Sequence, residues 1–355
     1  MKRAMQTLAL LLGLWASVAT AQPQGAPATQ APPVDLSASR NDQAARQLVQ
    51  PLNNAPVWRA VNSPSLGVTN LPEHEGGNLI NSAGQDWRLL RNGPVTMYGG
   101  WWLVAVLLAI AAFYLFRGEI RLKGAPTGRL IERFTLVERA THWLNAACFV
   151  VLALTGIVML FGKYMLLPLF GYTLFSILAI VSKTTHNFVG PLFAATTIAM
   201  FLIFVKDNLP RAYDLRWLAK AGGMLSRRGA EVPSHRFNGG EKLVFWGALV
   251  LLGVIATVTG FILDFPNYGQ TRVQMQGAWV IHVTAALLFI AVIMGHIYIG
   301  TIGMQGALDA MKEGYVDETW AREHHEYWYE DIKAGRIPAQ RSAPGPAVGD
   351  ARPRA

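Results

Sequence analysis

The chain has almost no cysteine. Among its 355 residues there is one, Cys148, and it lies within an apolar run. A single thiol excludes an intrachain disulfide, an iron–sulfur cluster held by cysteines of this chain, and the CxxCH attachment of a c-type haem. Any haem in this protein must therefore be held non-covalently, through histidine or methionine.

Charge is also scarce. Only 15% of the residues are charged and 52% are hydrophobic, whereas a soluble domain is about 25% charged. This is the composition of a membrane protein. The net charge of +9 does not indicate nucleic acid, because the basic residues collect in short loops beside apolar spans, where they report topology.

Residues 22–98 are predicted to be exported. Residues 1–21 combine a basic start, an apolar centre and a small-residue end, as a signal peptide does. An uncleaved anchor is the alternative, and either would export residues 22–98. These residues form a periplasmic segment that begins as a Pro/Ala/Gln-rich linker. Its second half carries Trp58 and Trp87 beside arginines, which suits either contact with a partner protein or a self-packed cap on the helices.

Five apolar spans come next in the chain. The first is residues 99–116, and a core of residues 117–303 holds the others at 142–161, 186–204, 243–263 and 278–302; residues 304–355 form a tail. Runs of this length cross a hydrocarbon layer of about 30 Å as helices. Residues 164–181 are also apolar, but Pro168 and Gly171 interrupt them. We expect an interfacial or re-entrant segment there.

The loops differ strongly in basic residues. Residues 117–141 and 205–242 hold six and eight Lys and Arg, whereas 162–185 hold two and 264–277 hold one. By the positive-inside rule the basic loops face the cytoplasm. We therefore expect a multi-pass protein of the bacterial inner membrane, with a periplasmic mature N-terminus and a cytoplasmic C-terminus.

Four of the eight histidines lie in the spans. His282 and His296 are 14 residues apart, which in a helix is about 21 Å along the axis and within about 40° of one face. By depth, His186 pairs with His282 near the outer leaflet and His142 with His296 near the inner leaflet. Ionisable groups at this depth are costly and typically functional, and two imidazoles saturate a haem iron for electron transfer. The pattern predicts two b-type haems with these axial ligands; independent buried imidazoles are the alternative.

Other residues carry weaker signals. Thr155-Gly156 and Thr259-Gly260 place small residues where a flat ring or another helix could approach. The histidines outside the spans are expected to face solvent or a partner: His74, His235, His324 and His325. A metal site with Glu323 is disfavoured, because adjacent side chains on a helix do not share a face.

Several motifs resemble one known family. They are His142-Trp143, His186 ahead of Gly190-Pro191, Asn238-Gly239-Gly240-Glu241-Lys242, Ile281-His282, Gly295-His296-Ile297-Tyr298 and Trp320–His325. Over about residues 129–333 the chain resembles the gamma subunit, the cytochrome b, of membrane-bound respiratory formate dehydrogenases. The resemblance implies an all-α membrane protein: a four-helix transmembrane diheme bundle, here with an extra N-terminal transmembrane helix and an exported N-terminal segment.

The resemblance also implies a division of labour. Formate would be oxidised in a molybdenum or tungsten alpha subunit and the electrons relayed through an iron–sulfur beta subunit. This chain would carry them from the outer haem to the inner haem and reduce membrane quinone on the cytoplasmic side.

By the same resemblance the quinone site would comprise Asn238, Gly240, Glu241 and the ligand His296, although many relatives have glutamine where Glu241 stands. From the residues alone, the Gly240 N–H could face a quinone oxygen and Glu241 could pass a proton. Asn238 could equally be the N-cap of the fourth span.

Two alternatives stay open. Related cytochromes serve nickel–iron hydrogenases and other molybdoenzymes, and the copurifying catalytic subunit would separate these donors. A haem-free anchor or transporter is an alternative of another class. Broken helices and polar clusters at mid-membrane would favour transport, whereas these spans are nearly uncharged apart from their histidines.

Overall fold

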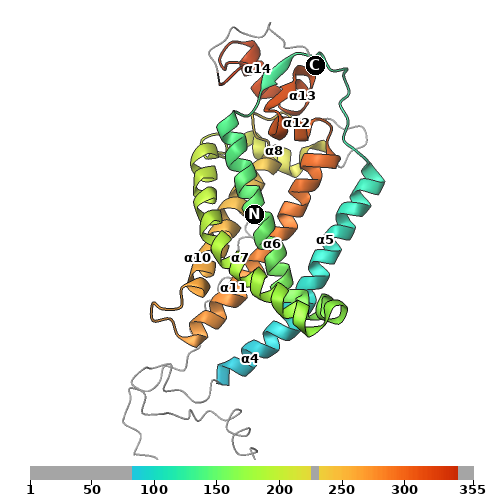
Figure 1. Cartoon of the computed structure of the whole chain (residues 1–355). Coiled ribbons are helices and arrows are strands. Elements are labelled where there is room, and N and C mark those ends of the chain that lie inside the picture. Colours follow the sequence, from blue (N-terminus) through green and yellow to red (C-terminus); the bar gives the residue numbers. More distant parts are fainter. Residues whose placement is uncertain (1–81, 225–231, 343–355) are drawn as a thin grey trace, which may run out of the picture. The chain divides into compact units, whose positions relative to one another are not determined.

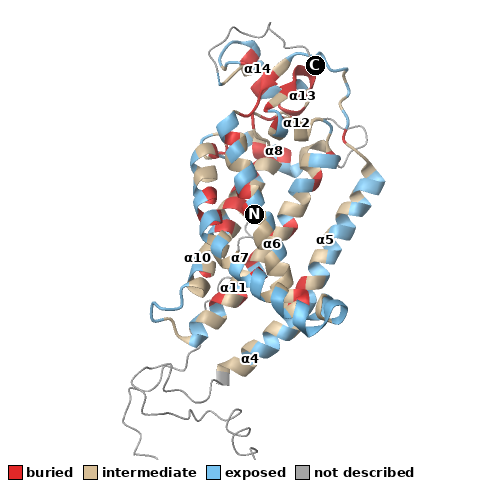
Figure 2. Cartoon of the chain, viewed as in Figure 1, coloured by how far each residue is buried: buried red, intermediate tan, exposed pale blue. Residues whose placement is uncertain are grey.

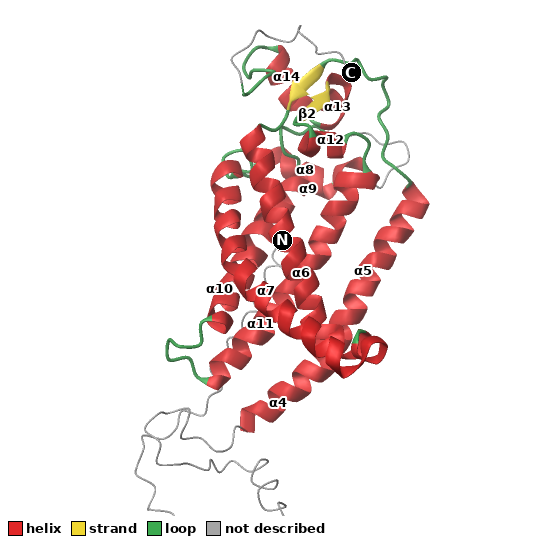
Figure 3. Cartoon of the chain, viewed as in Figure 1, coloured by secondary structure: helices red, strands yellow, loops and turns green. Residues whose placement is uncertain are grey.

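The computed structural model describes residues 82–224 and 232–342, which are almost entirely helical (Figure 3). The chain forms two compact units. The described part of the first is residues 82–88 and 271–277, and the remaining described residues belong to the second. The predicted signal peptide, most of the exported segment, His74 and residues 343–355 lie outside the described residues.

Within the described ranges, five helices are long and apolar enough to cross a membrane. In chain order they are α4 (Ser82–Leu90) with the π-helical η1 (Arg91–Val95) and α5 (Thr96–Arg117); α6 (Leu136–Met165); α7 (Leu167–Phe204); α9 (Gly239–Leu243) with the π-helical η3 (Val244–Leu252) and α10 (Gly253–Asp264); and α11 (Arg272–Tyr298) with the π-helical η4 (Ile299–Gly303). The predicted all-α membrane fold is confirmed. The helices extend beyond the predicted spans at most ends.

The third span differs most from expectation. α7 begins at Leu167, breaks at Gly171, where φ is 70°, and then continues without interruption to Phe204. Pro168 lies in its first turn, where a missing N–H costs nothing. From residue 172 onward, the residues of the predicted interfacial or re-entrant segment are therefore helical and continuous with the third span.

In the second unit, α6, α7, η3–α10 and α11 pack side by side, and α5 lies along this bundle (Figure 1). Many side chains on the bundle surface are large, apolar and exposed, among them Leu154, Ile198 and Leu202 (Figure 2). A helix that is apolar on its outward face as well as its inward face suits a lipid environment. Short strands and helices pack on one end of the bundle.

That end, which we call the polar end, is built from residues 120–135, 205–224, 232–238 and 304–342 (Figure 1). It contains β1 (Leu130–Glu132) paired antiparallel with β2 (Tyr315–Asp317), the short helices α8 (Ala212–Ala219), α12 (Ala307–Lys312), α13 (Glu318–His324) and α14 (Glu326–Lys333), and the 3₁₀ turn η2 (Ala221–Gly223). Its core includes the buried side chains of Ile131, Trp320, Trp328 and Ile332. The described part of the predicted tail is thus packed structure.

The Asp317 side chain links the loop before β1 to the start of α13. One carboxylate oxygen accepts hydrogen bonds from the backbone N–H of Thr127 (3.1 Å) and of Thr319 (2.8 Å). The other accepts one from the Gly128 N–H at 2.8 Å. The same side chain therefore caps α13 and holds the loop before β1.

Asp317→Ala removes both of the oxygens that accept these three hydrogen bonds. We expect it to destabilise the polar end by about 3 kcal/mol, at roughly 1 kcal/mol for each lost hydrogen bond. Thermal unfolding of the purified protein in detergent measures this as a lower midpoint. Glu330→Ala, at an exposed position of α14, is the matched control and should leave the midpoint unchanged. Equal midpoints in the two variants would contradict the role of Asp317.

Candidate functional site: two facing histidine pairs

The polar-end pair consists of His142 from α6 and His296 from α11. Their ring centres are 6.2 Å apart and their planes meet at 60°. Both rings line a cavity of about 1090 Å³. The His142 ring also packs edge-on against Trp143, whose indole N–H donates to the Met311 carbonyl at 3.0 Å.

The opposite-end pair consists of His186 from α7 and His282 from α11. Their ring centres are 6.1 Å apart, with an interplanar angle of 75°. They line a second cavity of about 360 Å³. The two pairs therefore occupy different cavities, as their depths along the spans predict.

Both pairs have the spacing that one iron between two imidazoles requires. A metal–imidazole nitrogen bond is about 2 Å long and the ring centre lies about 1 Å beyond that nitrogen, so the two ring centres of a bis-histidine site are about 6 Å apart. The observed separations of 6.1 and 6.2 Å agree with this value. The residues present therefore fit a haem in each cavity.

Hydrogen bonds fix the tautomers of the opposite-end pair. The His282 Nδ1 lies 3.0 Å from the Ala256 carbonyl, which can only accept, so Nδ1 carries the proton and Nε2 keeps its lone pair. The Thr155 hydroxyl donates to the Val151 carbonyl at 2.7 Å, so its oxygen accepts from His186 Nδ1 at 2.9 Å. Each ring therefore keeps a free lone pair on Nε2, the state in which an imidazole can bind a metal.

The two Thr-Gly pairs of the sequence lie at these histidines. Thr259 also approaches His282 Nδ1, at 3.1 Å. A Cβ added at Gly260 would lie 3.3 Å from His282 Cε1, and one at Gly156 would lie 3.6 Å from His186 Cε1. The threonines therefore orient the rings, and Gly260 leaves room for the His282 ring, whereas a side chain at Gly156 would be only in ordinary contact with His186. The sequence alone does not decide between ring approach and helix packing for these residues.

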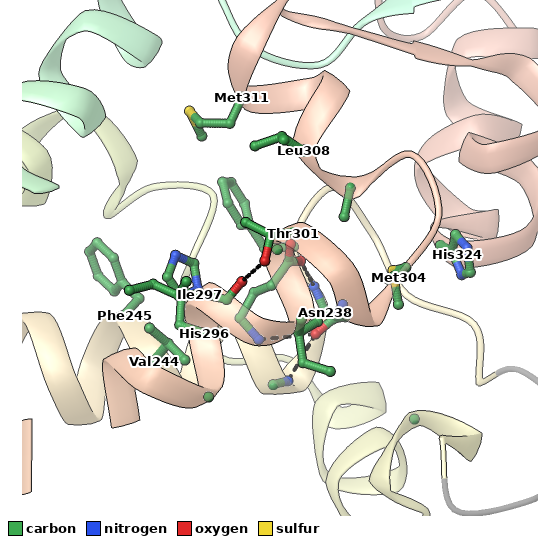
Figure 4. A pocket seen from close by; sticks show the side chains of 18 of the residues that line it. Asn238, Val244, Phe245, His296, Ile297, Thr301, Met304, Leu308, Met311 and His324 are labelled. Carbon is green, nitrogen blue, oxygen red and sulfur yellow. Dashed lines mark hydrogen bonds between the residues drawn. The ribbon is translucent and has the colours of Figure 1, made fainter. Parts of the chain in front are cut away.

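The polar-end pair lacks such a shell. In the described part of the chain, no hydrogen-bond partner meets the buried Nδ1 of His142. His296 is accessible to the cavity. This pair borders the larger of these two cavities, in which Asn238, His296 and Thr301 gather with apolar side chains such as Leu308 and Met311 (Figure 4).

The predicted quinone residues line this cavity but also form a helix cap. The Asn238 side chain accepts hydrogen bonds from the N–H groups of Gly240 and Glu241, both at 3.0 Å, and the Glu241 carboxylate accepts one from the Asn238 N–H at 2.9 Å. This is a capping box at the start of α9. The Gly240 N–H is thus engaged within the cap. Glycine is required there because a Cβ would lie 2.7 Å from the Trp217 ring.

Buried charges surround the cap. Arg133, whose side chain is 5% exposed, donates to Glu241 at 2.8 Å and to the Arg236 carbonyl at 2.9 Å. Its guanidinium lies about 5 Å from the rings of Phe134 and Trp320. Each cation here has a partner, because an uncompensated buried charge is strongly destabilising.

His325 corrects a prediction. The sequence suggests that it faces solvent or a partner, yet it is 1% exposed and its Nδ1 donates to the His235 carbonyl at 2.6 Å. His324 is likewise buried. Because β2 pairs with β1, the residues that follow β2, including His324 and His325, lie against the core of the polar end. No periodic pattern in the sequence indicates that these histidines, or Arg133 and Arg236, are buried.

Burial and, to a lesser extent, the Arg133 guanidinium lower the pKa of His325 to about 3, although Glu241 opposes them. The folded protein therefore holds this imidazole neutral. The described residues contain no group of three or more His, Cys, Asp or Glu side chains that could hold a metal ion. Glu323 instead accepts hydrogen bonds from the N–H groups of Lys123 and Gly124.

The fold and the site together define an integral membrane protein of the cytochrome b class. The family model of prokaryotic cytochrome b561 matches residues 133–314, about half of the chain. The chain belongs to this family, and b-type haem is its cofactor. The match begins after α5, so the N-terminal span lies outside the matched range.

Curated relatives are cytochrome b556 subunits of formate dehydrogenases. The cytochrome b556(fdo) subunit of Escherichia coli strain K12 is 32% identical over 207 residues, which are 57% of this chain and 93% of the relative. The nitrate-inducible cytochrome b556(Fdn) subunit of the same strain is 29% identical over 209 residues, 58% of this chain and 93% of the relative. The subunit of Haemophilus influenzae is 29% identical over 207 residues, 57% of this chain and 83% of the relative.

The low pKa of His325 predicts a pH-dependent stability. Below about pH 6.5, the ordinary pKa of histidine, the unfolded chain binds a proton at His325, whereas the folded chain binds it only below about pH 3. This group therefore lowers the free energy of unfolding as the pH falls through that window. The unfolding midpoint should therefore drop between about pH 7.5 and about pH 5. His325→Gln should have a smaller drop, because the other titrating groups are shared. Equal drops in both proteins would show that His325 titrates normally.

Proposed function

We propose that this chain is the membrane-embedded cytochrome b subunit of a formate dehydrogenase, and that it carries electrons through two b-type haems to a membrane quinone. The observation that carries the proposal is the presence of two histidine pairs, each with the separation of axial ligands to one iron. The relatives, which are cytochrome b556 subunits of formate dehydrogenases, support the choice of donor.

The two histidine pairs would each serve one cofactor. His186 and His282 hold one haem, and His142 and His296 hold the other. A b-type haem with two histidine ligands supplies a one-electron carrier whose iron has no open position for oxygen. The Thr155 hydroxyl and the Ala256 carbonyl keep the opposite-end imidazoles in the ligating tautomer. The rings of Phe149, Phe193 and Phe289 pack against one another between the two cavities.

The quinone site would lie in the larger cavity beside His296. Asn238, Gly240 and Glu241 line this cavity with it. The cap engages the Asn238 oxygen and the Gly240 N–H, so the Asn238 amide NH₂ is the donor best suited to a quinone oxygen. Glu241 and Arg133 lie at the polar end, where protons for quinol formation would enter.

The orientation is inferred from the basic loops, which would place the polar end in the cytoplasm. The mature N-terminus would be periplasmic, after a cleaved signal peptide at residues 1–21. Electrons would come from a molybdenum or tungsten alpha subunit through an iron–sulfur beta subunit to the opposite-end pair. Each electron that moves inward then works with or against about 2.3 kcal/mol per 100 mV of membrane potential.

Haem content tests the ligand assignment. The wild type should contain two b-type haems per chain, measured by a pyridine haem assay and a reduced-minus-oxidised spectrum. His186→Ala and His296→Ala should each lose or alter one haem, because each removes one axial ligand from a different cavity. His235→Ala, which lies outside the spans, is the control and should retain both. Undiminished haem in single variants of all four histidines, or none in the wild type, would overturn the cytochrome assignment.

Asn238→Asp tests the quinone site while preserving the cap. Aspartate keeps a capping oxygen but replaces the amide NH₂ with an oxygen. We expect unchanged haem content and unchanged reduction of the haems by formate in the whole complex. Formation of quinol should slow at least tenfold, as loss of a hydrogen bond worth about 1.4 kcal/mol would cause. Wild-type quinol formation in this variant would exclude Asn238 from the site.

The donor is tested separately. Purification of the complex from its native membrane should yield a molybdenum- or tungsten-containing subunit that oxidises formate. Copurification of a nickel–iron hydrogenase would keep the cytochrome function and change the donor.

A further inference from the structure

The N-terminal span brings a cation to the cavity of the opposite-end pair. Arg91, the first residue of η1, lines this cavity together with Trp279, His186 and His282. Its guanidinium carbon lies 5.3 Å from the centre of the Trp279 ring. Trp279 precedes His282 by three residues, so the two side chains lie on the same side of α11, one turn apart.

The charges that line this cavity are unevenly balanced. Among the described residues they are two cations, Arg91 and Lys183, and one carboxylate, Asp264. Lys183 precedes His186 by three residues on α7, as Trp279 precedes His282 on α11. The charged residues that line this cavity therefore carry a net positive charge. They lie toward the end of the cavity that is one helical turn before each histidine.

Close packing holds Arg91 in this position. A Cβ added at Gly99 would lie 2.6 Å from Leu287 Cδ1, so α5 approaches α11 there as closely as glycine allows. The Thr96 hydroxyl donates to the Arg91 carbonyl at 2.6 Å and joins η1 to α5. The first span is thus docked at the same end of the bundle at which Arg91 lines the cavity.

We infer that Arg91, with Lys183, binds the carboxylate edge of the porphyrin held by His186 and His282. A b-type haem carries two propionates on one edge, and their negative charges need partners where the ring leaves the apolar bundle. A guanidinium pairs with a carboxylate through two parallel hydrogen bonds, and its stacking on Trp279 orients it. The N-terminal span, which lies outside the family match, would then complete a cofactor site of the family core. This inference rests on the proposed haem ligation.

The midpoint potential of the haem reports this charge independently of turnover. A nearby cation favours the reduced form, because reduction removes one positive charge from the iron. Arg91→Gln should therefore lower the midpoint of one haem and leave the other unchanged. We expect a three- to tenfold smaller ratio of reduced to oxidised haem at a given potential, or about 28 to 59 mV for one electron.

A redox titration of the purified protein, followed in the visible spectrum, makes this measurement. His186→Ala identifies which spectral component belongs to the opposite-end pair. Lys183→Gln should shift that component downward as well, whereas Arg91→Lys should restore most of the wild-type midpoint. Lys163→Gln is the matched control: Lys163 is an exposed cation at the same end of α6, and it does not line the cavity.

The outcomes separate the two proposals. If the wild type contains two haems and Arg91→Gln leaves both midpoints and the haem content unaltered, this inference is wrong while the proposed function stands. Equal shifts in Arg91→Gln and Lys163→Gln would also overturn it, because they would reflect surface charge alone. If Arg91→Gln loses haem, the charge-preserving Arg91→Lys decides: recovery of the haem supports binding by the cation, and continued loss refutes it. A wild type without haem would overturn the proposed function itself.

Discussion

One rigid helix sets the distance between the two histidine pairs. α11 carries His282, Phe289 and His296 at intervals of seven residues, and seven residues of α-helix are about two turns and about 10.5 Å. Phe289 is therefore midway between the two histidines, on nearly the same face. Its ring centre lies 4.6 Å from that of Phe149 and 6.2 Å from that of Phe193. Phe149 and Phe289 line both cavities, so these rings form the partition between them.

The two ends of the bundle differ in the polar and charged groups that lie near the histidines. At the opposite-end pair, neutral hydroxyl and carbonyl groups orient the imidazoles. At the polar end, the buried Arg133 and Arg236 form ion pairs with the partly exposed Glu241 and with the buried Glu138. Burial lowers the pKa of Arg236, and the nearby Glu138 carboxylate opposes this shift. An electron carrier needs no titratable side chain, whereas quinone reduction consumes protons. These ion pairs lie at the end of the bundle at which the proposed quinone reduction would consume protons.

The sequence contained enough to predict the spans and to place the histidines. Apolar run length and the basic loops define the helices, and helical geometry pairs His282 with His186 and His296 with His142 by depth. These arguments need only local periodicity and charge. The haem ligands and the quinone residues stay predictions. Residue spacing shows which side chains can come together, but it does not show which molecule binds between them.

The polar end could not be predicted in the same way. Its fold depends on β1 pairing with β2, two strands of three residues that are far apart in the chain, and neither has a detectable period. In the sequence His325 therefore looks exposed, although it lies under Trp320 and Trp328 with ring centres 5.0 and 6.3 Å away. The cap at Asn238 is one of the two roles that the sequence allows, and the structure shows that one side chain can both cap α9 and line the cavity.

The N-terminal span contacts α11 near both of its histidines. Near one end, Gly99 packs on Leu287 and Arg91 lies over Trp279. Near the other end, the rings of Phe113 and Tyr114 pack edge-on against Tyr298, two residues after His296, at 6.1 and 6.2 Å. These contacts flank both histidines of α11. Sliding of α11 along its axis would displace one histidine of each pair at once, so a helix that braces it at both ends protects the two sites together.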